Sequence, residues 1–431
     1  MDRKIAEKLT LWKDSPYRKP LVLQGARQVG KTYSVLAFGR AHYDNVAYFN
    51  FESDPSLRDL FSGRIEPDYL VPLLSAMSRQ TIIAEKTLIF FDEVQLCERA
   101  LTSLKYFCEL APDYHIIVAG SLLGIATNRT AFSFPVGKVD FMTMGPMDME
   151  EFFLAMGDDF LIAQIKACFE SNAPLPAPLH EDALARYRQY LLVGGMPECV
   201  QQFAATGDYN LIRNTQNGIL ESYLNDMSKY NKENEIKKTC LTYNSITAQL
   251  SQKHTRFRYK LIKQGGRAAE FENAIEWLVL SGIVSRVYAV EQIAKPLENV
   301  IDIDDFKIYM SDMGLLAAKD QLYPDDILYA SGDLNQFKGG MVENYVQTQL
   351  IANGHRTYYW HSKSEAEIDF IIQRDGEIIP IEVKAADNTR AKSLNTYIKR
   401  YAPAYAIKLS TKNFSLEDGK KTVPLYAAFC I

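Results

Sequence analysis

The hydrophobic positions in the first third of the chain gather in short apolar runs, with amphipathic segments between them. These runs cover residues 21–23, 46–51, 87–91 and 116–119. Nearly unbroken apolar runs are typical of strands buried on both faces, and their alternation with helical patterns indicates a parallel sheet covered by helices. We therefore predict an α/β domain, with helices at residues 3–13 and from residue 31 to about residue 40.

From about residue 148 the periodicity becomes mainly helical. Helices are predicted over residues 148–170 and 182–229, with a break at Gly194-Gly195-Met196-Pro197. Residues 236–310 follow the order of a winged helix, three helices and then two strands. A stretch rich in Asp, Gly and Pro at residues 323–340 indicates a linker. Beyond it we expect a helix at 341–353, short strands, and a helix near 390–400.

Length and composition set outer bounds on this organisation. A chain of 431 residues exceeds what one hydrophobic core usually serves, which indicates two to four domains. With 47% hydrophobic and 23% charged residues and a net charge of -5, the chain does not resemble a basic protein that coats nucleic acid, although a local basic face stays compatible with these values. The 6 scattered cysteines form no CxxC pair and are expected to be free thiols in a reducing cytosol. No signal peptide and no apolar run of roughly 18 residues is present, so we expect a cytoplasmic protein without a membrane partner.

A glycine-rich segment that fits G-x-x-x-x-G-K-[ST] lies between the first apolar run and the helix that follows it. Its residues are Gly25, Ala26, Arg27, Gln28, Val29, Gly30, Lys31 and Thr32, and Tyr33 comes next. A strand before and a helix after are the context that this motif requires. Backbone amides surround the phosphates, Lys31 places a cation on the terminal phosphates, and the Thr32 hydroxyl is a ligand for Mg2+. The segment therefore predicts a site for ATP and Mg2+.

Two acidic residues follow directly after the apolar run at 87–91. Asp92 is predicted to hold Mg2+ through water, and Glu93 to polarise the water that attacks the terminal phosphate. The alternative, a solvated strand end, is disfavoured by the preceding apolar run and by the phosphate loop upstream. Ser121, after the run at 116–119, is a candidate γ-phosphate sensor, although a strand-ending turn explains it equally well. Lys138 is a weaker candidate for contact with a nucleotide, including that of a neighbouring subunit.

These motifs resemble those of the bacterial and archaeal AAA-type ATPases that carry a C-terminal region of uncharacterised function, the AAA_14/DUF4143 proteins. The matching segments are residues 25–32, 91–95, 119–121, 194–198 and 381–384. The resemblance implies ATP binding and hydrolysis. It also implies an AAA-type core, which we place at residues 1–160, a helical lid-like region at 161–230, a winged-helix-like domain at 231–325 and a restriction-endonuclease-like α/β domain at 326–431. Relatives often carry an arginine near the position of Lys138, and this sequence departs from them there.

The C-terminal part contains a predicted hairpin with charged residues on one face. Asp375-Gly376 is a preferred two-residue turn. Counting outward from it, Asp369 falls opposite Glu382 and Glu367 falls opposite Lys384, all on the same face. Two facing carboxylates repel each other unless a cation lies between them, and oxygen ligands suit Mg2+ or Mn2+.

This pattern resembles the D-x(n)-E-x-K motif of the PD-(D/E)xK nuclease superfamily. The resemblance implies metal binding by Asp369 and Glu382, with Lys384 stabilising charge on a phosphoryl oxygen, and Glu343 on the preceding helix matches the extra acidic residue often found there. The alternatives are an exposed hairpin with a Glu367–Lys384 pair and no metal, or a nuclease fold that has lost its activity.

The most basic stretch of the chain is residues 253–263, with Arg267 just beyond it. Aromatic residues lie between the basic ones, which suits contact with a phosphate backbone. Internal packing with paired cations explains the same pattern equally well. We therefore predict an ATP-driven multi-domain switch protein and keep two outputs open. One is DNA binding, with cleavage at the C-terminal carboxylates. The other is a regulatory or scaffold role on a protein partner, or in a homo-oligomer.

Overall fold

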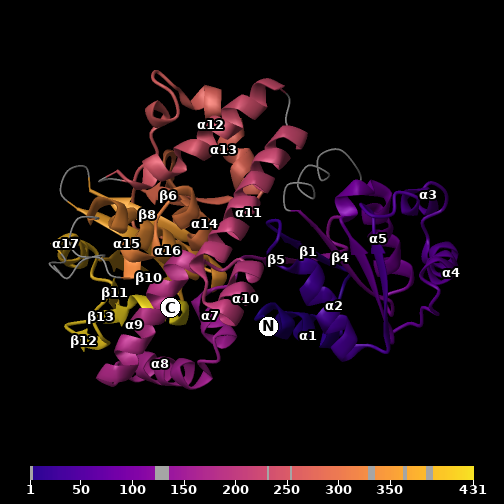
Figure 1. The fold of residues 1–431 in the computed structure, drawn as a ribbon, viewed down its shortest axis with the longest axis horizontal. Coiled ribbons are helices and arrows are strands. Elements are labelled where there is room, and N and C mark those ends of the chain that lie inside the picture. Colours follow the sequence, from indigo (N-terminus) through magenta and orange to yellow (C-terminus); the bar gives the residue numbers. More distant parts are fainter. Residues whose placement is uncertain are drawn as a thin grey trace. The chain divides into compact units, whose positions relative to one another are not determined.

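The computed structural model describes residues 3–121, 135–230, 233–252, 255–328, 335–362, 366–384 and 392–431. The chain divides into two compact units (Figure 1). The N-terminal unit consists mainly of residues 2–145 and the C-terminal unit mainly of residues 146–431. Among the described residues, none of the helices combines the length and the apolar character needed to cross a lipid bilayer.

A five-stranded parallel sheet forms the centre of the N-terminal unit, in the order β2-β3-β4-β1-β5. Its strands are β1 (Leu21–Gly25), β2 (Asn45–Asn50), β3 (Thr87–Asp92), β4 (His115–Ser121) and β5 (Asp140–Met144). The four apolar runs correspond to β1, β2, β3 and β4, so the predicted parallel sheet is confirmed. The unit ends at residue 145, ahead of the boundary predicted at residue 160.

Helices cover both faces of this sheet, because alternate residues of each buried strand point to opposite sides. Leu88 and Phe90 of β3 belong to one core with α1 (Ile5–Asp14) and α2 (Lys31–His42). Ile89 and Phe91 belong to a second core. This second core includes residues of α3 (Leu57–Leu60), α4 (Pro67–Ser78), η1 (Val94–Leu96) and α5 (Glu98–Leu110). Figure 1 shows α1 and α2 on one side of the sheet and α4 and α5 on the other.

The C-terminal unit begins with helices, as its periodicity predicts. The described helices of the whole unit are α7 (Met149–Ala155), α8 (Asp159–Ser171), α9 (Ala177–Val193), α10 (Pro197–Thr206), α11 (Tyr209–Tyr230), α12 (Glu233–Leu250), α13 (Ala268–Leu280), α14 (Met313–Lys319), α15 (Pro324–Leu328), α16 (Asn335–Ala352) and α17 (Lys392–Tyr401). The middle of the three helices expected within residues 236–310 is reduced to a 3₁₀ turn, η2 (Tyr259–Leu261). The predicted linker at 323–340 lies partly outside the described residues, and its described ends belong to α15 and α16.

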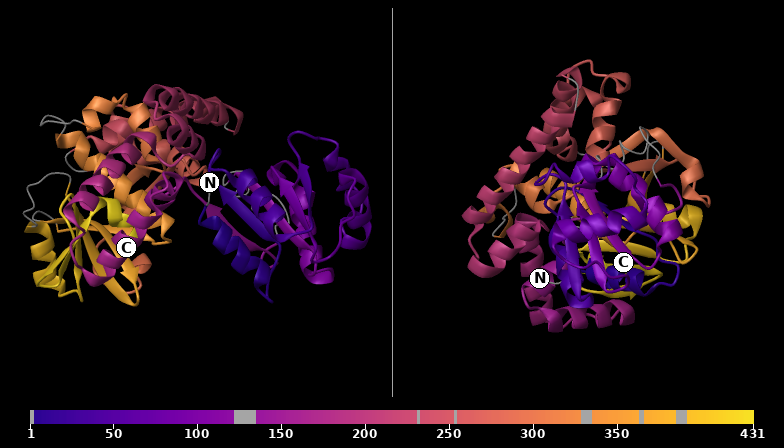
Figure 2. Two further views of the ribbon diagram at one scale, coloured as in Figure 1. Left: turned by 60° about the horizontal axis from the view of Figure 1, so that its bottom comes forward. Right: turned by 90° about the vertical axis from the view of Figure 1, so that its right-hand side faces the viewer.

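An eight-stranded mixed sheet completes this unit, in the order β12-β13-β11-β10-β9-β8-β6-β7. Its strands are β6 (Val284–Val290), β7 (Ile301–Met310), β8 (Thr357–His361), β9 (Glu367–Arg374), β10 (Glu377–Val383), β11 (Ala406–Ser410), β12 (Ser415–Glu417) and β13 (Lys420–Pro424), with the 3₁₀ turns η3 (Leu297–Val300) and η4 (Leu425–Cys430) beside them. The orange and yellow strands lie together in both views of Figure 2.

The strands expected to complete a separate winged helix, β6 and β7, are part of this large sheet. Tyr288 and Ala289 of β6 pair in parallel with Tyr358 and Tyr359 of β8. Residues 231–325 and 326–431 therefore share one sheet, and the boundary predicted between them runs through a compact unit. The sequence pattern could not show this, because the pairing joins strands about seventy residues apart.

Candidate functional site

The glycine-rich segment forms the turn between β1 and α2, as predicted. Gly30 has a φ of 90° directly before α2, a left-handed conformation that glycine adopts without steric cost. Gly25 ends β1 beside β5, where an added Cβ atom would lie 2.1 Å from the carbonyl oxygen of Met144. The two glycines are thus required for different reasons, one for its backbone angle and one for the close approach of a neighbouring strand.

The start of α2 offers backbone amides to an anion. The first amides of a helix have no partner inside the helix, and the helix dipole adds a positive potential there. Arg3, in the N-terminal segment, links the glycine-rich loop to the end of β5 through two hydrogen bonds. Its Nη1 donates to the carbonyl of Val29 at 2.8 Å and its Nη2 to the carbonyl of Gly145 at 2.9 Å. Nothing in the sequence pattern singles out Arg3 for this contact.

Lys31 is buried at the base of the loop. Its Nζ donates to the carbonyl oxygens of Gly25 at 3.0 Å and Ala26 at 2.8 Å. Burial lowers the pKa of Lys31 to about 8, and the nearby carboxylates of Glu93 and Asp92 oppose this shift. Among the described residues, the hydrogen bonds of the ammonium group thus go to neutral carbonyl groups, although the group lies within the field of two carboxylates.

Asp92, at the carboxyl end of β3, is the centre of a hydrogen-bond network. Its Oδ2 accepts hydrogen bonds from the hydroxyl of Thr32 at 2.8 Å, the hydroxyl of Tyr48 at 3.0 Å and the amide of Asn50 at 3.4 Å. Asn50 pairs with Asp92 in the ladder between β2 and β3. The sequence prediction names Thr32 and Asp92 and misses Tyr48 and Asn50, although both lie in the apolar run at 46–51.

Glu93 follows Asp92 in a left-handed backbone conformation, with a φ of 52°. Non-glycine residues in this region carry a conformational cost and are frequent at functional sites. Burial raises the pKa of Glu93, while a hydrogen bond from the side-chain amide of Gln95 lowers it. A carboxylate with a raised pKa is better suited to accept a proton than an ordinary exposed one.

The other sequence candidates near the loop have different placements. Tyr33 lies on α2 with an exposed side chain. Ser121 ends β4, where its backbone pairs with Gly25, but its side chain lies outside what the structure describes. Lys138 forms an ion pair with Glu109 at 3.0 Å, so its described contact is within its own chain.

The predicted hairpin in the C-terminal unit is present. Asp375 and Gly376 both have positive φ angles and form the turn, and Arg374 pairs with Glu377 as counted. The ladder continues to Phe370 and Ile381. Beyond this last pair, the backbone amide of Val383 donates to Oδ2 of Asp369 at 2.7 Å.

The described ladder between β9 and β10 ends at Phe370 and Ile381, so the counted position of Glu367 opposite Lys384 stays a prediction. Glu367 lies opposite His361 of β8, and its Oε1 contacts Lys307 Nζ at 2.6 Å. Lys384 instead contacts Glu382 Oε1 at 2.7 Å. The two strands are largely buried, so the alternative of an exposed hairpin is wrong.

Glu343 of α16 joins this group, which we call the carboxylate cluster (Glu343, Glu367, Asp369 and Glu382, with Lys307 and Lys384). Glu343 Oε2 accepts hydrogen bonds from Thr255 and Tyr309, each at 3.0 Å, and lies 3.5 Å from Lys307 Nζ. Burial and the carboxylate of Glu343 raise the pKa of Asp369 well above its ordinary value, against the effect of Lys307. The predicted acidic residues therefore come together, with two lysines between them that neutralise part of their charge.

Comparisons with known proteins agree with the geometry of the N-terminal unit. Residues 17–153 match the family model of an AAA domain. The N-terminal unit is an AAA-type P-loop domain. Residues 184–326 and 338–428 match two models of domains of unknown function, DUF8612 and DUF4143. The predicted resemblance is thus confirmed for the AAA domain and for the C-terminal region, while the nuclease-like character of that region stays a prediction.

Several solved structures are similar to the chain at low identity. The Walker-type ATPase of Pyrococcus abyssi is 14% identical over 74% of this chain and 95% of that one, with a TM-score of 0.47. The ORC1 protein of Aeropyrum pernix in complex with DNA is 12% identical over 74% and 91%, with a TM-score of 0.28. The RuvB Holliday junction branch migration motor of Thermotoga maritima is 12% identical over 67% and 90%, with a TM-score of 0.30. No curated protein matches the chain.

Outside the AAA-type domain, the basic stretch at 253–263 is partly neutralised. Arg256 contacts Asp305 at 2.9 Å and Lys263 contacts Glu270 at 3.3 Å, whereas residues 253 and 254 lie outside the described part.

Within the described ranges, no group of three or more His, Cys, Asp or Glu side chains is arranged to hold a metal ion. A metal ion at the carboxylate cluster would therefore require its side chains to rearrange.

Proposed function

We propose that this protein is an ATP-hydrolysing switch whose nucleotide site is the loop between β1 and α2. The observation that carries the proposal is the convergence of Lys31, Thr32 and Asp92. A buried cation and a hydroxyl from the start of α2 meet a carboxylate from the end of β3, and the hydroxyl and carboxylate are hydrogen-bonded at 2.8 Å. P-loop enzymes need these three groups, in this order along the chain, to hold phosphates and Mg2+.

The residues present fit both ligands. Thr32 and Asp92 offer oxygen ligands of the kind that Mg2+ prefers, and bound Mg2+ neutralises charge on the phosphate oxygens. Lys31 would exchange its two carbonyl partners for phosphate oxygens, which attract a cation more strongly. Glu93 would orient the attacking water and accept its proton, and Gln95 holds the Glu93 carboxylate in place.

Two substitutions separate binding from hydrolysis. Lys31→Ala should abolish ATP binding measured by isothermal titration, whereas Glu93→Gln should retain binding and lose turnover by roughly a hundredfold or more. Lys8→Ala and Glu7→Gln, on the exposed face of α1, are the matched controls. Unchanged ATP turnover in Glu93→Gln would remove Glu93 from its proposed role.

For the output of the switch, we propose action on DNA through the carboxylate cluster. The support is that Glu343, Asp369 and Glu382 come from three different elements yet share one electrostatic neighbourhood. In addition, Oε2 of Glu382 is buried and accepts no hydrogen bond from the described residues. A buried carboxylate oxygen without a donor is costly, and a bound cation would remove that cost.

A second candidate is regulation of a protein partner by an inactive nuclease-like fold. It is favoured by Lys307 and Lys384, which already neutralise the carboxylates that a metal would need. Mn2+-dependent nicking of plasmid DNA distinguishes the two candidates. If the cluster cleaves DNA, Asp369→Ala and Glu382→Ala lose nicking while Glu377→Ala, exposed on β10, retains it. Equal nicking in all variants, or none in the wild type, favours the partner role. The material that co-purifies with Glu93→Gln would then identify the partner class.

A further inference from the structure

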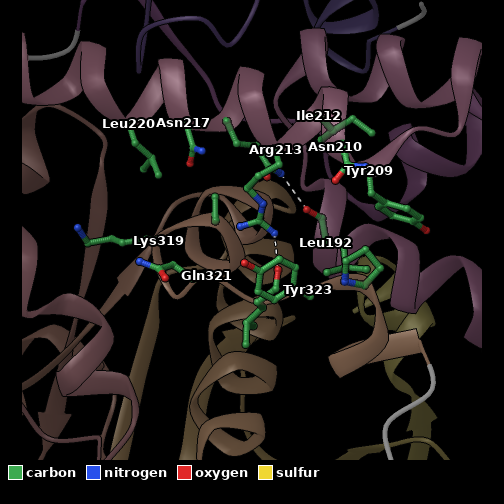
Figure 3. Close-up of a pocket in the computed structure, with 14 residues that line it drawn as sticks. Leu192, Tyr209, Asn210, Ile212, Arg213, Asn217, Leu220, Lys319, Gln321 and Tyr323 are labelled. Atoms are coloured by element: carbon green, nitrogen blue, oxygen red, sulfur yellow. Dashed lines mark hydrogen bonds between the residues drawn. The ribbon is translucent and has the colours of Figure 1, made fainter.

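A pocket of about 410 Å³ lies in the C-terminal unit, between α9, α11, α14 and the segment that leads into α15. Half of the lining residues belong to α11, and Figure 3 shows Arg213 extending from this helix toward Tyr323. The volume falls in the range of natural small-molecule sites, roughly 300–1000 Å³. The pocket lies within the C-terminal unit and is independent of the phosphate loop.

Arg213 gives the pocket its charge. Its Nη2 donates to the carbonyl of Leu322 at 2.6 Å, but its Nη1 is buried and has no hydrogen-bond partner among the described residues. Burial lowers the pKa of Arg213, opposed only by the Tyr323 hydroxyl. Leaving a buried guanidinium donor unpaired is costly, and a carboxylate is the partner whose geometry matches it best.

Gln216, one turn further along α11, provides the opposite kind of group. Its side-chain nitrogen donates to the carbonyls of Leu192 at 2.8 Å and Val193 at 3.1 Å, which fixes the orientation of the amide. The oxygen Oε1 is then left buried without a donor. Residues three apart on a helix are neighbours on one face, so the free donor of Arg213 and the free acceptor of Gln216 belong to the same wall.

The remaining lining residues are mainly apolar, which distinguishes this pocket from a site for a simple inorganic anion. Its apolar side chains are Leu192, Ile212, Leu220, Ala318, Leu322 and Pro324. Lys319 adds a second cation, whose Nζ lies 3.8 Å from the centre of the Tyr243 ring and donates to Asn244. No Asp or Glu is among the lining residues, so the described wall carries only positive charge.

We propose that this pocket binds a small organic acid with an apolar body, a carboxylate, and a hydroxyl or amino group on the adjacent carbon. The carboxylate pairs with Nη1 of Arg213, and the neighbouring hydroxyl or amino group donates to Oε1 of Gln216. The apolar body contacts the leucine and isoleucine side chains. A hydroxy acid and an amino acid share this chemistry, and Lys319 favours the neutral hydroxyl over a second cation.

Isothermal titration of the full chain with phenyllactate tests the proposal, and L-phenylalanine in a parallel arm distinguishes the two sources. We expect phenyllactate to bind at millimolar concentration or below. Phenylpropanoate lacks the hydroxyl, phenylethanol lacks the carboxylate and inorganic phosphate lacks the apolar body, so each should bind roughly tenfold more weakly or not at all. Failure of both acids to bind the wild type, or equal binding of any of these three controls, overturns the proposal.

Substitutions place the ligand in the pocket. Arg213→Gln should weaken binding of phenyllactate by roughly tenfold or more, whereas Arg188→Gln, exposed on α9, should not change it. If Arg213→Gln does not fold, Asn217→Trp decides, because Asn217 is an exposed residue of α11 at the pocket wall and the indole would fill the space. Undiminished binding by a folded Arg213→Gln or by Asn217→Trp would overturn the assignment. ATP binding is expected to be unchanged in both, so a failure here is distinguishable from a failure of the ATPase proposal.

Discussion

The hydroxyl of Thr32 donates a 2.8 Å hydrogen bond to Oδ2 of Asp92, across 60 residues of sequence. The bond connects the first turn of α2 with the carboxyl end of β3. The same oxygen of Asp92 also accepts from Tyr48 and Asn50, so its position is set by two strands as well as by the helix. The two oxygens that we propose for the Mg2+ site are thus held close together by the fold itself, which would reduce the ordering required when the metal binds.

Removing the Thr32 hydroxyl should uncouple Mg2+ from nucleotide binding. In Thr32→Val the side chain keeps its shape but loses the metal ligand and the bond to Asp92. We expect ATP affinity without Mg2+ to change little, and the gain in affinity on adding Mg2+ to fall by roughly tenfold. Titrations with and without a chelator measure both quantities. Thr10→Val, on α1, is the matched control, and an undiminished Mg2+ effect in Thr32→Val would contradict the role of the hydroxyl.

The pKa of Lys31 predicts a pH limit for nucleotide binding. Burial lowers this pKa to about 8, so the free site carries a protonated lysine below that pH and a neutral amine above it. Phosphates require the cation, so binding above pH 8 should take up about one proton and weaken about tenfold per pH unit. Calorimetry in buffers of different ionisation enthalpy measures the proton uptake. Lys31→Arg stays charged and should show none; absence of uptake by the wild type at high pH would show that Lys31 is not the group that titrates.

Gln95 should influence the pH at which the rate of ATP hydrolysis falls on the acid side of the pH profile, the acid limb. A base must be deprotonated to act, and burial raises the pKa of Glu93, so the rate should fall with decreasing pH at values above those of an ordinary glutamate. The hydrogen bond from Gln95 opposes this shift. Gln95→Leu should therefore move the acid limb to higher pH and leave the high-pH rate less affected. Gln80→Leu, exposed after α4, is the control, and an unmoved limb in Gln95→Leu argues for a different base.

The N-terminal unit could be predicted because its signals are local. Unbroken apolar runs identify β1 to β4, and the glycine loop is recognisable from eight consecutive residues. The role of Asp92 could be predicted for the same reason, since it follows a buried strand directly. The roles of Tyr48 and Asn50 could not be predicted, because they depend on the pairing of β2 with β3 in the sheet.

The C-terminal unit was predicted less well because its contacts are long-range. The turn at Asp375 and Gly376 sets the register of β9 and β10 correctly near the loop. Further out, β9 has a second neighbour, β8, and Lys307 of β7 reaches Glu367 from a strand that precedes the hairpin by about sixty residues. A hairpin count includes neither neighbour, so it could not show that Glu367 contacts Lys307. The pocket at Arg213 has no sequence signal at all, since its walls come from helices far apart in the chain.

Asp312 explains the Gly194-Gly195-Met196-Pro197 break and predicts a stability effect. Its Oδ2 accepts from the amide of Gly195 at 2.6 Å and its Oδ1 from the amide of Leu315 at 2.8 Å, so it joins the break to α14. A Cβ on Gly195 would lie 1.9 Å from the carbonyl oxygen of Met147, which requires glycine there. Asp312→Asn turns one acceptor into a donor facing an amide, and should lower the free energy of unfolding by about 1–3 kcal/mol.

The effect of Asp312→Asn should depend on pH. Burial raises the pKa of Asp312 to about 6 from 3.8, so between these values the folded protein holds a proton that the unfolded chain has released. This contribution to stability is present at the acid end of that window and is lost as the pH rises through about 6. Asp312→Asn lacks this slope. Urea denaturation at pH 4.5 and 7 measures it, with Asp182→Asn, exposed on α9, as control. A parallel loss at both pH values would show that Asp312 does not titrate in this range.

Lys307 offers a test of the carboxylate cluster that does not depend on catalysis. The side chain is 1% exposed, and its Nζ contacts Glu367 at 2.6 Å and Glu343 at 3.5 Å. Burial alone would lower the pKa of Lys307, but the carboxylate of Glu343, with Tyr309 and Glu367, outweighs it and raises the pKa well above its ordinary value. Lys307→Met leaves these carboxylates without their cation and should lower the free energy of unfolding by about 3 kcal/mol. Lys263→Met, in an exposed pair with Glu270, should cost less than about 1 kcal/mol.

The effect of Mn2+ on the melting temperature tests whether the carboxylates can bind a divalent cation. A ligand that binds only the folded state raises stability in proportion to the logarithm of its concentration over its dissociation constant. If Glu343, Asp369 and Glu382 can take a divalent cation, the melting temperature of Lys307→Met should rise with Mn2+ more than that of the wild type, because the competing ammonium is gone. The further substitution Asp369→Ala should abolish the rise, whereas Glu377→Ala should not. Equal Mn2+ shifts in the wild type and in Lys307→Met would mean that the lysine occupies no metal position, and would favour the partner-binding alternative for this unit.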